Sequence, residues 1–332
     1  MASLQIHAPL VLAAAGTFIP LCSLSVALRI YARKVRKVGL GVDDYLIMGA
    51  LVFVIGMAVT IIAEVATHQL GYPAPAPSTQ VGKPNANITF YPPSLLLPPT
   101  LGLIKLSLIF FYRRSFSVHA ASRFNVVTWI AALLILLWTL SFFFSLVFIC
   151  GVNFSAYWAS TVIEKEYCTD TSLLHNAFAV SDVLTDVGVL SLPVPMIFGL
   201  RLTFERKVGI LAVFGLGALT IAASIVRMVI FIQATAGIYN PLQLHVLCTT
   251  GLYFSLLECA LGLLAACLPA QYGLLSTQGV QSLIGSVRSA ISLRSYGSAT
   301  NQGAQLPGSR DGVEGHGNGK RNGGGERKRE RS

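Results

Sequence analysis

The sequence is poor in charged residues. Only 11% of its 332 residues are Asp, Glu, Lys or Arg, whereas soluble domains carry roughly 25%. Hydrophobic residues make up 54%, and apolar blocks of about bilayer length recur over the first 275 residues. This composition excludes an ordinary soluble domain. It predicts an all-α protein that crosses the lipid bilayer several times.

Other features are missing as well, and each absence narrows the function. Residues 1–7 contain no Lys or Arg, so no cleavable signal peptide is expected. Six cysteines are too few for a disulfide scaffold. Neither a His-Glu-x-x-His zinc motif nor a Gly-x-Ser-x-Gly elbow occurs, so no enzyme and no metal site is expected. The formal net charge is +10. Because the basic residues lie beside the apolar blocks and in the tail, no nucleic acid is expected as a partner.

The apolar pattern predicts seven membrane-spanning helices within a domain of residues 8–275. The predicted spans are 8–31, 43–66, 92–113, 124–149, 173–199, 207–233 and 245–269. Four prolines disturb the outer half of the third span, so that half is expected to begin irregularly. Most Lys and Arg residues flank one set of span ends, and only Lys83 and Lys165 stand at the other. By the positive-inside rule, residues 1–7 are expected outside and the C-terminus in the cytoplasm. We expect the protein at the plasma membrane.

The tail, residues 276–332, differs in character from the rest. Residues 277–295 place apolar side chains at helical spacing, which fits either a helix on the inner membrane surface or an unstructured linker. Residues 297–332 are rich in Gly, Asn, Ser and Arg. We expect this basic segment to be disordered.

The expected outer loops carry two kinds of modification signal. Asn87 and Asn153 begin Asn-x-Ser/Thr triplets, so a glycoprotein is expected, although such triplets also occur by chance. Cys150 and Cys168 bracket the loop before the fifth span. An external loop permits a disulfide between them.

Six ionisable residues interrupt the predicted spans: Glu64, Lys105, Asp182, Asp186, Arg227 and Glu258. Charges at membrane depth are costly, so they usually face the bundle interior and pair with one another. The spacing of Asp182 and Asp186 puts both on one helix face. Depth estimates group these aspartates with Lys105 and Glu258, and place Arg227 near the outer surface beside Glu64.

The buried polar core admits two interpretations. Polar networks fasten helices together in membranes. They also form switches or sites for a ligand or a proton. If all six groups are ionised, two cations face four carboxylates, so one carboxyl carries a proton or a cation or water completes the charge balance.

A second polar group occurs at the expected cytoplasmic start of the second span, in "GLGVDDYLIMGA". A carboxylate at this position caps free backbone N–H groups and complements the positive end of the helix. Capping accounts for one of Asp43 and Asp44. The other suggests pairing with the neighbouring basic loop.

These segments resemble the fungal rhodopsin-domain integral membrane proteins, the seven-span family that includes the Pth-type receptors of plant-pathogenic fungi. The resemblance rests on "RIYARKVRKVGLGVDDYLIMGA", "GLIKLSLIFFYRRSF", "SDVLTDVGVLSLPVPMIFGLRL", "KVGILAVFGLGALTIAASIVRM" and "YFSLLECALGLLAACLP", in this order over about residues 10–275. It implies the motif positions Asp43, Asp44, Lys105, Tyr112, Arg113, Asp186, Pro193, Pro195, Lys207, Arg227, Ser255, Glu258 and Pro269.

The resemblance to rhodopsins does not extend to the chromophore. Rhodopsins bind retinal through a Lys in the last span, and the seventh span here has none. We therefore expect no cofactor. A 360–600 nm absorbance band after incubation with retinal would contradict this expectation.

Three functions fit the sequence. The first is a receptor-like sensor of an extracellular or membrane-borne ligand, with a G protein as a hypothetical cytoplasmic partner. The second is a proton-coupled or small-molecule transporter, since intramembrane carboxylates are typical of that class. However, no internal repeat between the halves is evident. The third is a membrane scaffold that does not signal.

Overall fold

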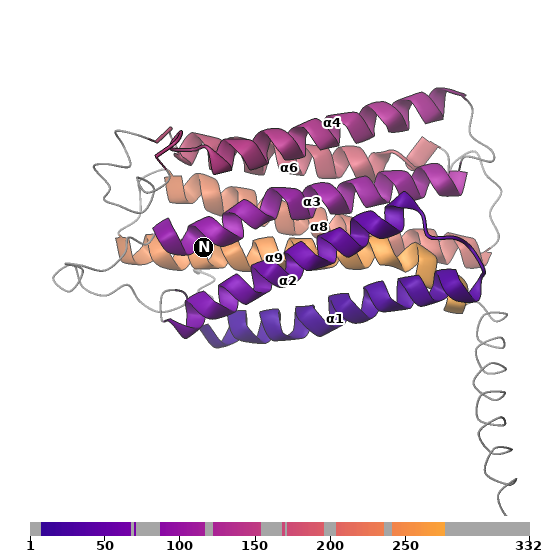
Figure 1. Cartoon of the computed structure of the whole chain (residues 1–332), viewed down its shortest axis with the longest axis horizontal. Helices are drawn as coiled ribbons and strands as arrows, with labels where there is room; N and C mark the ends of the chain where they lie inside the picture. Colours follow the sequence, from indigo (N-terminus) through magenta and orange to yellow (C-terminus); the bar gives the residue numbers. More distant parts are fainter. Residues whose placement is uncertain are drawn as a thin grey trace, which may run out of the picture. The chain divides into compact units, whose positions relative to one another are not determined.

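The computed structural model describes residues 8–67, 70, 87–116, 122–153, 168–169, 171–195, 204–235 and 241–275. Seven helices in this part of the chain are long and apolar enough to cross a membrane, as the sequence predicts. They run side by side (Figure 1). The helices are α1 (Ala8–Val35), α2 (Val42–Ala66), α3 (Asn87–Phe116), α4 (Ser122–Val147), α6 (Thr171–Ser191), α8 (Phe204–Thr235) and α9 (Pro241–Leu275).

Most helices differ from their predicted spans by a few residues at one or both ends. The seventh span was expected to end at residue 269, whereas α9 continues through Pro269 to Leu275. Prolines also lie at two other differences. The fifth span was expected to continue to residue 199, whereas α6 ends at Ser191, just before Pro193 and Pro195. Proline lacks the N–H that would continue the helical ladder. The expectation that the third span begins irregularly is wrong, because α3 is a continuous helix that contains Pro92, Pro93, Pro98 and Pro99. Transmembrane helices tolerate proline where neighbouring groups satisfy the freed carbonyls.

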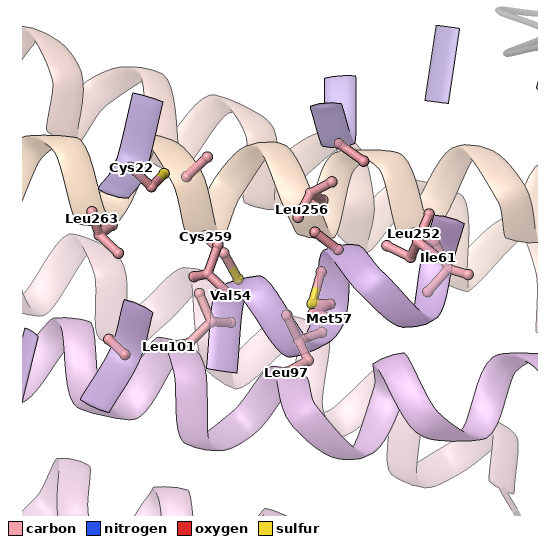
Figure 2. Close-up of a cluster of buried hydrophobic side chains, with 14 of the residues drawn as sticks. Cys22, Val54, Met57, Ile61, Leu97, Leu101, Leu252, Leu256, Cys259 and Leu263 are labelled. Carbon is pink, nitrogen blue, oxygen red and sulfur yellow. The ribbon is translucent and has the colours of Figure 1, made fainter. Parts of the chain in front are cut away.

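The apolar core lies where α9 packs against α1, α2 and α3. Figure 2 shows its side chains pointing toward one another from these helices. Its labelled members are Cys22, Val54, Met57, Ile61, Leu97, Leu101, Leu252, Leu256, Cys259 and Leu263. By contrast, α4 exposes much of its apolar surface, including Leu133 and Leu134. In a bilayer such a surface faces lipid.

The C-terminal end of α4 is covalently linked to the segment that precedes α6. Cys150 and Cys168 form a disulfide, which confirms the bond predicted from the sequence. The Thr169 N–H also donates a 2.9 Å hydrogen bond to the Ile149 carbonyl. Both contacts hold the start of α6 beside the end of α4.

The helices α3 and α4 are in close contact at Gly102. A Cβ atom built at Gly102 lies 2.0 Å from Thr139 Oγ1 on α4, whereas one built at Gly188 on α6 meets no atom within 4 Å. We expect Gly102→Ala to lower the free energy of unfolding by about 1–3 kcal/mol, because overpacking forces the helices apart. Gly188→Ala is the control and should be neutral or stabilising, because Ala favours the helix by up to ~1 kcal/mol. Thermal unfolding in detergent measures both, and equal melting temperatures would contradict the close contact.

Candidate functional site

Lys105 of α3 is the first cation at the centre of the bundle. Its Nζ donates hydrogen bonds of 2.6 Å to Asp182 Oδ1 and to Thr185 Oγ1 on α6. It also lies 2.9 Å from Asp186 Oδ1, one helical turn along α6. The i, i+4 spacing of the two aspartates therefore lets one ammonium group contact both carboxylates.

Arg227 of α8 is the second cation. It donates to Asp182 Oδ2, and its Nε lies 2.8 Å from Glu258 Oε2 on α9. Asp182 thus pairs with both cations, one at each carboxylate oxygen. The result is a continuous chain of ion pairs from α3 through α6 and α8 to α9. We call Lys105, Asp182, Asp186, Arg227 and Glu258 the ion-pair layer.

The ion-pair layer is shielded from its surroundings by aromatic rings. Asp182 and Arg227 have no exposed surface, and Glu258 is 1% exposed. The Lys105 ammonium lies 4.9 Å from the centre of the Trp138 ring, and the Arg227 guanidinium 5.3 Å from that of Phe178. Trp138 and Phe178 stack on each other. Contacts between cations and ring faces are strongest where water is excluded, so the rings stabilise both cations.

The charges of the ion-pair layer do not balance, since two cations face three carboxylates. Oxygen atoms of Asp182, Asp186 and Glu258 all lie within 4.8 Å of one another. Asp186 Oδ2 is buried and has no hydrogen-bond partner among the described residues. A divalent metal takes several oxygen ligands, yet Lys105 and Arg227 already engage most of these oxygens. The layer therefore suits one additional proton better than a metal.

Two small cavities adjoin the ion-pair layer. The Asp186 cavity has a volume of about 40 Å³ and is lined by Lys105, Tyr112, Asp186 and Glu258 among apolar side chains. The His175 cavity has a volume of about 10 Å³ and is lined by His175, Phe178 and Ser255, also among apolar side chains. Both lie between the helices that carry the layer.

The structure brings together most, but not all, of the residues that the sequence grouped. Lys105, both aspartates and Glu258 meet as expected. Arg227 does not lie near the outer surface beside Glu64 but joins the layer. The sequence estimate took the depth of Arg227 from its distance to Lys207, whereas the ion pairs of Arg227 with Asp182 and Glu258 place it at the level of the layer. Glu64 is 8% exposed, and its Oε2 has no hydrogen-bond partner in the described part of the chain.

Asp43 and Asp44 form a second buried network at the other end of α2. Asp44 Oδ2 accepts a 3.0 Å hydrogen bond from the Gly41 N–H, which is a capping contact. Arg29 of α1 lies 2.5 Å from Asp43 Oδ2 and 2.8 Å from Asp44 Oδ1. Arg33 and Arg114 also pair with both carboxylates. We call Arg29, Arg33, Asp43, Asp44 and Arg114 the arginine network.

The arginine network also forms hydrogen bonds with backbone carbonyls, and one of these bonds reaches a further helix, α9. Arg29 Nη1 donates a 2.5 Å hydrogen bond to the Ala266 carbonyl on α9. Ser107 of α3 donates a 2.8 Å hydrogen bond to the Asp43 carbonyl. The network therefore joins α1, α2, α3 and α9.

The other predicted site residues form no ion pair with either network in the described part of the chain. Tyr112 is buried and lines the Asp186 cavity. The Arg113 guanidinium stands 4.2 Å from the Trp129 ring centre. Asn153 is exposed after the end of α4, whereas Asn87 is the first residue of α3 and its side chain lies outside the described part. Glycosylation of both stays a prediction.

Several contributing residues were missed by sequence reasoning. Thr185 follows Asp182 by three residues and so shares its helix face, a spacing that could have identified it. Arg29 was counted among the charges flanking the first span, yet it is fully buried. Trp138 and Phe178 are aromatic residues in apolar helices, and nothing in the sequence distinguishes them from ordinary core residues.

Comparisons with known proteins agree on the family and leave the activity open. The family model described as "Fungal rhodopsin domain" matches residues 28–277. The chain is 26% identical over 300 residues to the "Polyenoic acids biosynthesis gene cluster protein Ba17b" of Metarhizium anisopliae, with 82% of this chain and 75% of the relative covered. It is 25% identical over 282 residues to the "Phomoidride biosynthesis cluster protein H" of a fungal species, with 77% and 85% covered.

A further relative is named for a membrane protein family. The chain is 27% identical over 180 residues to a "SAT4 family membrane protein" of Emericella nidulans, with 53% of this chain and 42% of the relative covered. The match to the family model spans about three quarters of the chain and includes the whole ion-pair layer and the whole arginine network.

Proposed function

The chain belongs to the fungal rhodopsin domain family, and we propose that it is a receptor-like membrane sensor whose ion-pair layer responds to a small ligand. One observation carries this proposal: buried ion pairs connect α3, α6, α8 and α9 beside a cavity. A ligand that contacts Asp186 competes directly with Lys105. The same event changes the contacts among four helices.

The two networks share helices, which offers a route from the ligand to the cytoplasmic end. Lys105 contacts the ion-pair layer, and Ser107, two residues later on α3, donates to the Asp43 carbonyl of the arginine network. Glu258 and Ala266 place both networks on α9 as well. A shift of α3 or α9 therefore changes both networks. A second arrangement of these helices would supply the two-state element that a switch requires.

The chemistry of the layer restricts the ligand. With three carboxylates against two cations, it favours a cationic or neutral ligand over an anion. A water molecule needs about 10–15 Å³, so the 40 Å³ cavity admits about three waters and must enlarge for an organic ligand. Two relatives are named for biosynthesis gene clusters. We propose a small fungal metabolite, sensed at the plasma membrane, with a G protein as a possible cytoplasmic partner.

Two alternatives, a small-molecule carrier and a scaffold, receive less support. A small-molecule carrier must pass its substrate through the whole bundle, so both cavities, of about 40 and 10 Å³, would have to enlarge and join. A scaffold requires neither cavities nor an imbalance of charge in the layer. The sensor proposal accounts for both features.

A thermal-shift screen of the purified protein tests the sensor proposal. Small cationic and neutral fungal metabolites are added to wild-type protein, and a ligand of the layer is expected to raise the melting temperature. Lys105→Met and Asp186→Asn should abolish the shift, because each removes one partner of the contact that the ligand competes for.

The matched control is Arg113→Met, which removes a cation from α3 outside the layer. This variant should keep the full thermal shift. If a ligand raises the melting temperatures of the wild type and all three variants equally, it binds outside the ion-pair layer, and this result would contradict the proposal.

A further inference from the structure

The two cavities lie in series, on opposite sides of the ion-pair layer. Along α6, Phe178 lines the His175 cavity, Asp182 belongs to the layer and lines neither cavity, and Asp186 lines the Asp186 cavity. Along α9, Ser255 lines the His175 cavity and Glu258 lines the Asp186 cavity. On both helices, the change from one cavity to the other occurs at the layer.

The other two helices repeat this order. Along α3, Leu97 lines the His175 cavity, and Lys105 lines the Asp186 cavity. On the antiparallel α8, Phe231 lines the His175 cavity, Arg227 belongs to the layer and lines neither, and Thr220 lines the Asp186 cavity. Four helices thus define one line of cavities along the bundle, and the Asp182–Arg227 pair interrupts it.

The sizes of the cavities decide what can occupy this line. At about 10–15 Å³ per water molecule, the cavities of about 40 and 10 Å³ hold about three waters and one water. The occupants are therefore water, protons or small ions. A metal ion needs several free oxygens, whereas a proton needs a single acceptor.

The residues along the line supply proton acceptors. His175 stands at one end, and Asp186 Oδ2 is a buried oxygen without a hydrogen-bond partner among the described residues. The charged groups around Asp186 are Lys105 of α3, Asp182 of its own helix, Arg227 of α8 and Glu258 of α9. Ser224 of α8 is also adjacent. The third carboxylate, which the two cations do not balance, provides a place for one proton.

We propose that the protein conducts protons across the membrane through these two cavities, with Asp186 as the carboxylate that receives and releases the proton at the ion-pair layer. At each transfer one O–H bond of a water or hydronium breaks and one O–H bond to the carboxylate forms, so one positive charge moves per proton. Phe178 and the Asp182–Arg227 pair separate the cavities. This activity goes beyond ligand sensing and needs no ligand.

Proton flux into liposomes tests the proposal. The full chain is reconstituted into vesicles that contain a pH-sensitive dye, and valinomycin with a potassium gradient sets a membrane potential. We expect wild-type vesicles to change internal pH faster than protein-free vesicles. Asp186→Asn should reduce the flux to the protein-free level, whereas Asp186→Glu should retain it, because only the latter keeps a group that binds protons.

A second variant examines the separation between the cavities. Phe178 is 4% exposed, lines the His175 cavity and covers the Arg227 guanidinium. Phe178→Ala should increase the flux several-fold, because water can then reach the layer from the His175 cavity. The control is Phe144→Ala on α4, a ring that is 51% exposed and stacks on Phe148. This control should show the wild-type flux.

Three results would overturn the proposal. The first is a proton flux at the protein-free level in both wild type and Phe178→Ala, when melting curves show that both proteins are folded. The second is an unchanged flux in Asp186→Asn. The third is a flux that requires sodium, which would assign the line of cavities to a metal cation. Because no ligand is added, none of these results bears on the thermal-shift test of the sensor proposal.

Discussion

Replacing Arg227 with Met is expected to lower the free energy of unfolding by about 3–5 kcal/mol, since removal of one partner leaves buried charges uncompensated. Arg227 is fully buried and is the cation that pairs with Glu258, while it shares Asp182 with Lys105. Its loss leaves three carboxylates opposite one cation. Unfolding in mixed micelles, followed by circular dichroism, measures the change.

A second substitution distinguishes lost charge from lost packing. Arg227→Met combined with Asp182→Asn restores an excess of one carboxylate, and we expect it to recover part of the loss. The control is Arg113→Met, which removes a cation that has a ring contact but no ion pair among the described residues. Equal losses in Arg227→Met and Arg113→Met would contradict a structural role of the ion-pair layer.

Replacing Arg29 with Met is expected to cost a similar ~3–5 kcal/mol, again because a buried ion pair loses one side. Arg29 has no exposed surface, and its guanidinium contacts Asp43, Asp44 and the Ala266 carbonyl. No other arginine of the network contacts α9 in the described part of the chain. The loss should therefore also loosen the contact of α1 and α2 with this end of α9, which cysteine crosslinking between α1 and α9 near Ala266 can detect.

The matched control for this prediction is Arg33→Met. Arg33 lies one helical turn after Arg29 and pairs with the same two aspartates, but its side chain is 12% exposed. Exposed pairs contribute about 0–1 kcal/mol, so the partly exposed Arg33 should lose clearly less than Arg29. If both variants lose the same stability, the contact between Arg29 and α9 is not what stabilises this end of the bundle.

Some features follow from the sequence because the membrane makes local patterns decisive. A span must be apolar over about 20 residues, and this requirement reveals the seven helices without any knowledge of their packing. The disulfide was predictable because Cys150 and Cys168 bracket one short loop. The grouping of Lys105 with Asp182, Asp186 and Glu258, though not the individual pairs, followed from the cost of charges at membrane depth, which favours their pairing.

Other features depend on how the helices are set beside one another. The apolar length of a span does not say at which residue of α8 the bilayer begins. The depth of Arg227, and its pairing with Asp182 rather than with Glu64, therefore became evident only from the fold. Hydropathy likewise does not separate Arg29, which is buried against α9, from its neighbour Arg33.

The sequence by itself determined the class of protein, the number of spans, the disulfide and the presence of a buried polar core. Each of these depends on composition or on short spacing along the chain. Only the tertiary structure decided which charges pair and that two cavities lie on either side of the ion-pair layer. The physical reason is that partners and cavities are set by the rotation and depth of whole helices, which depend on packing between residues far apart in the chain.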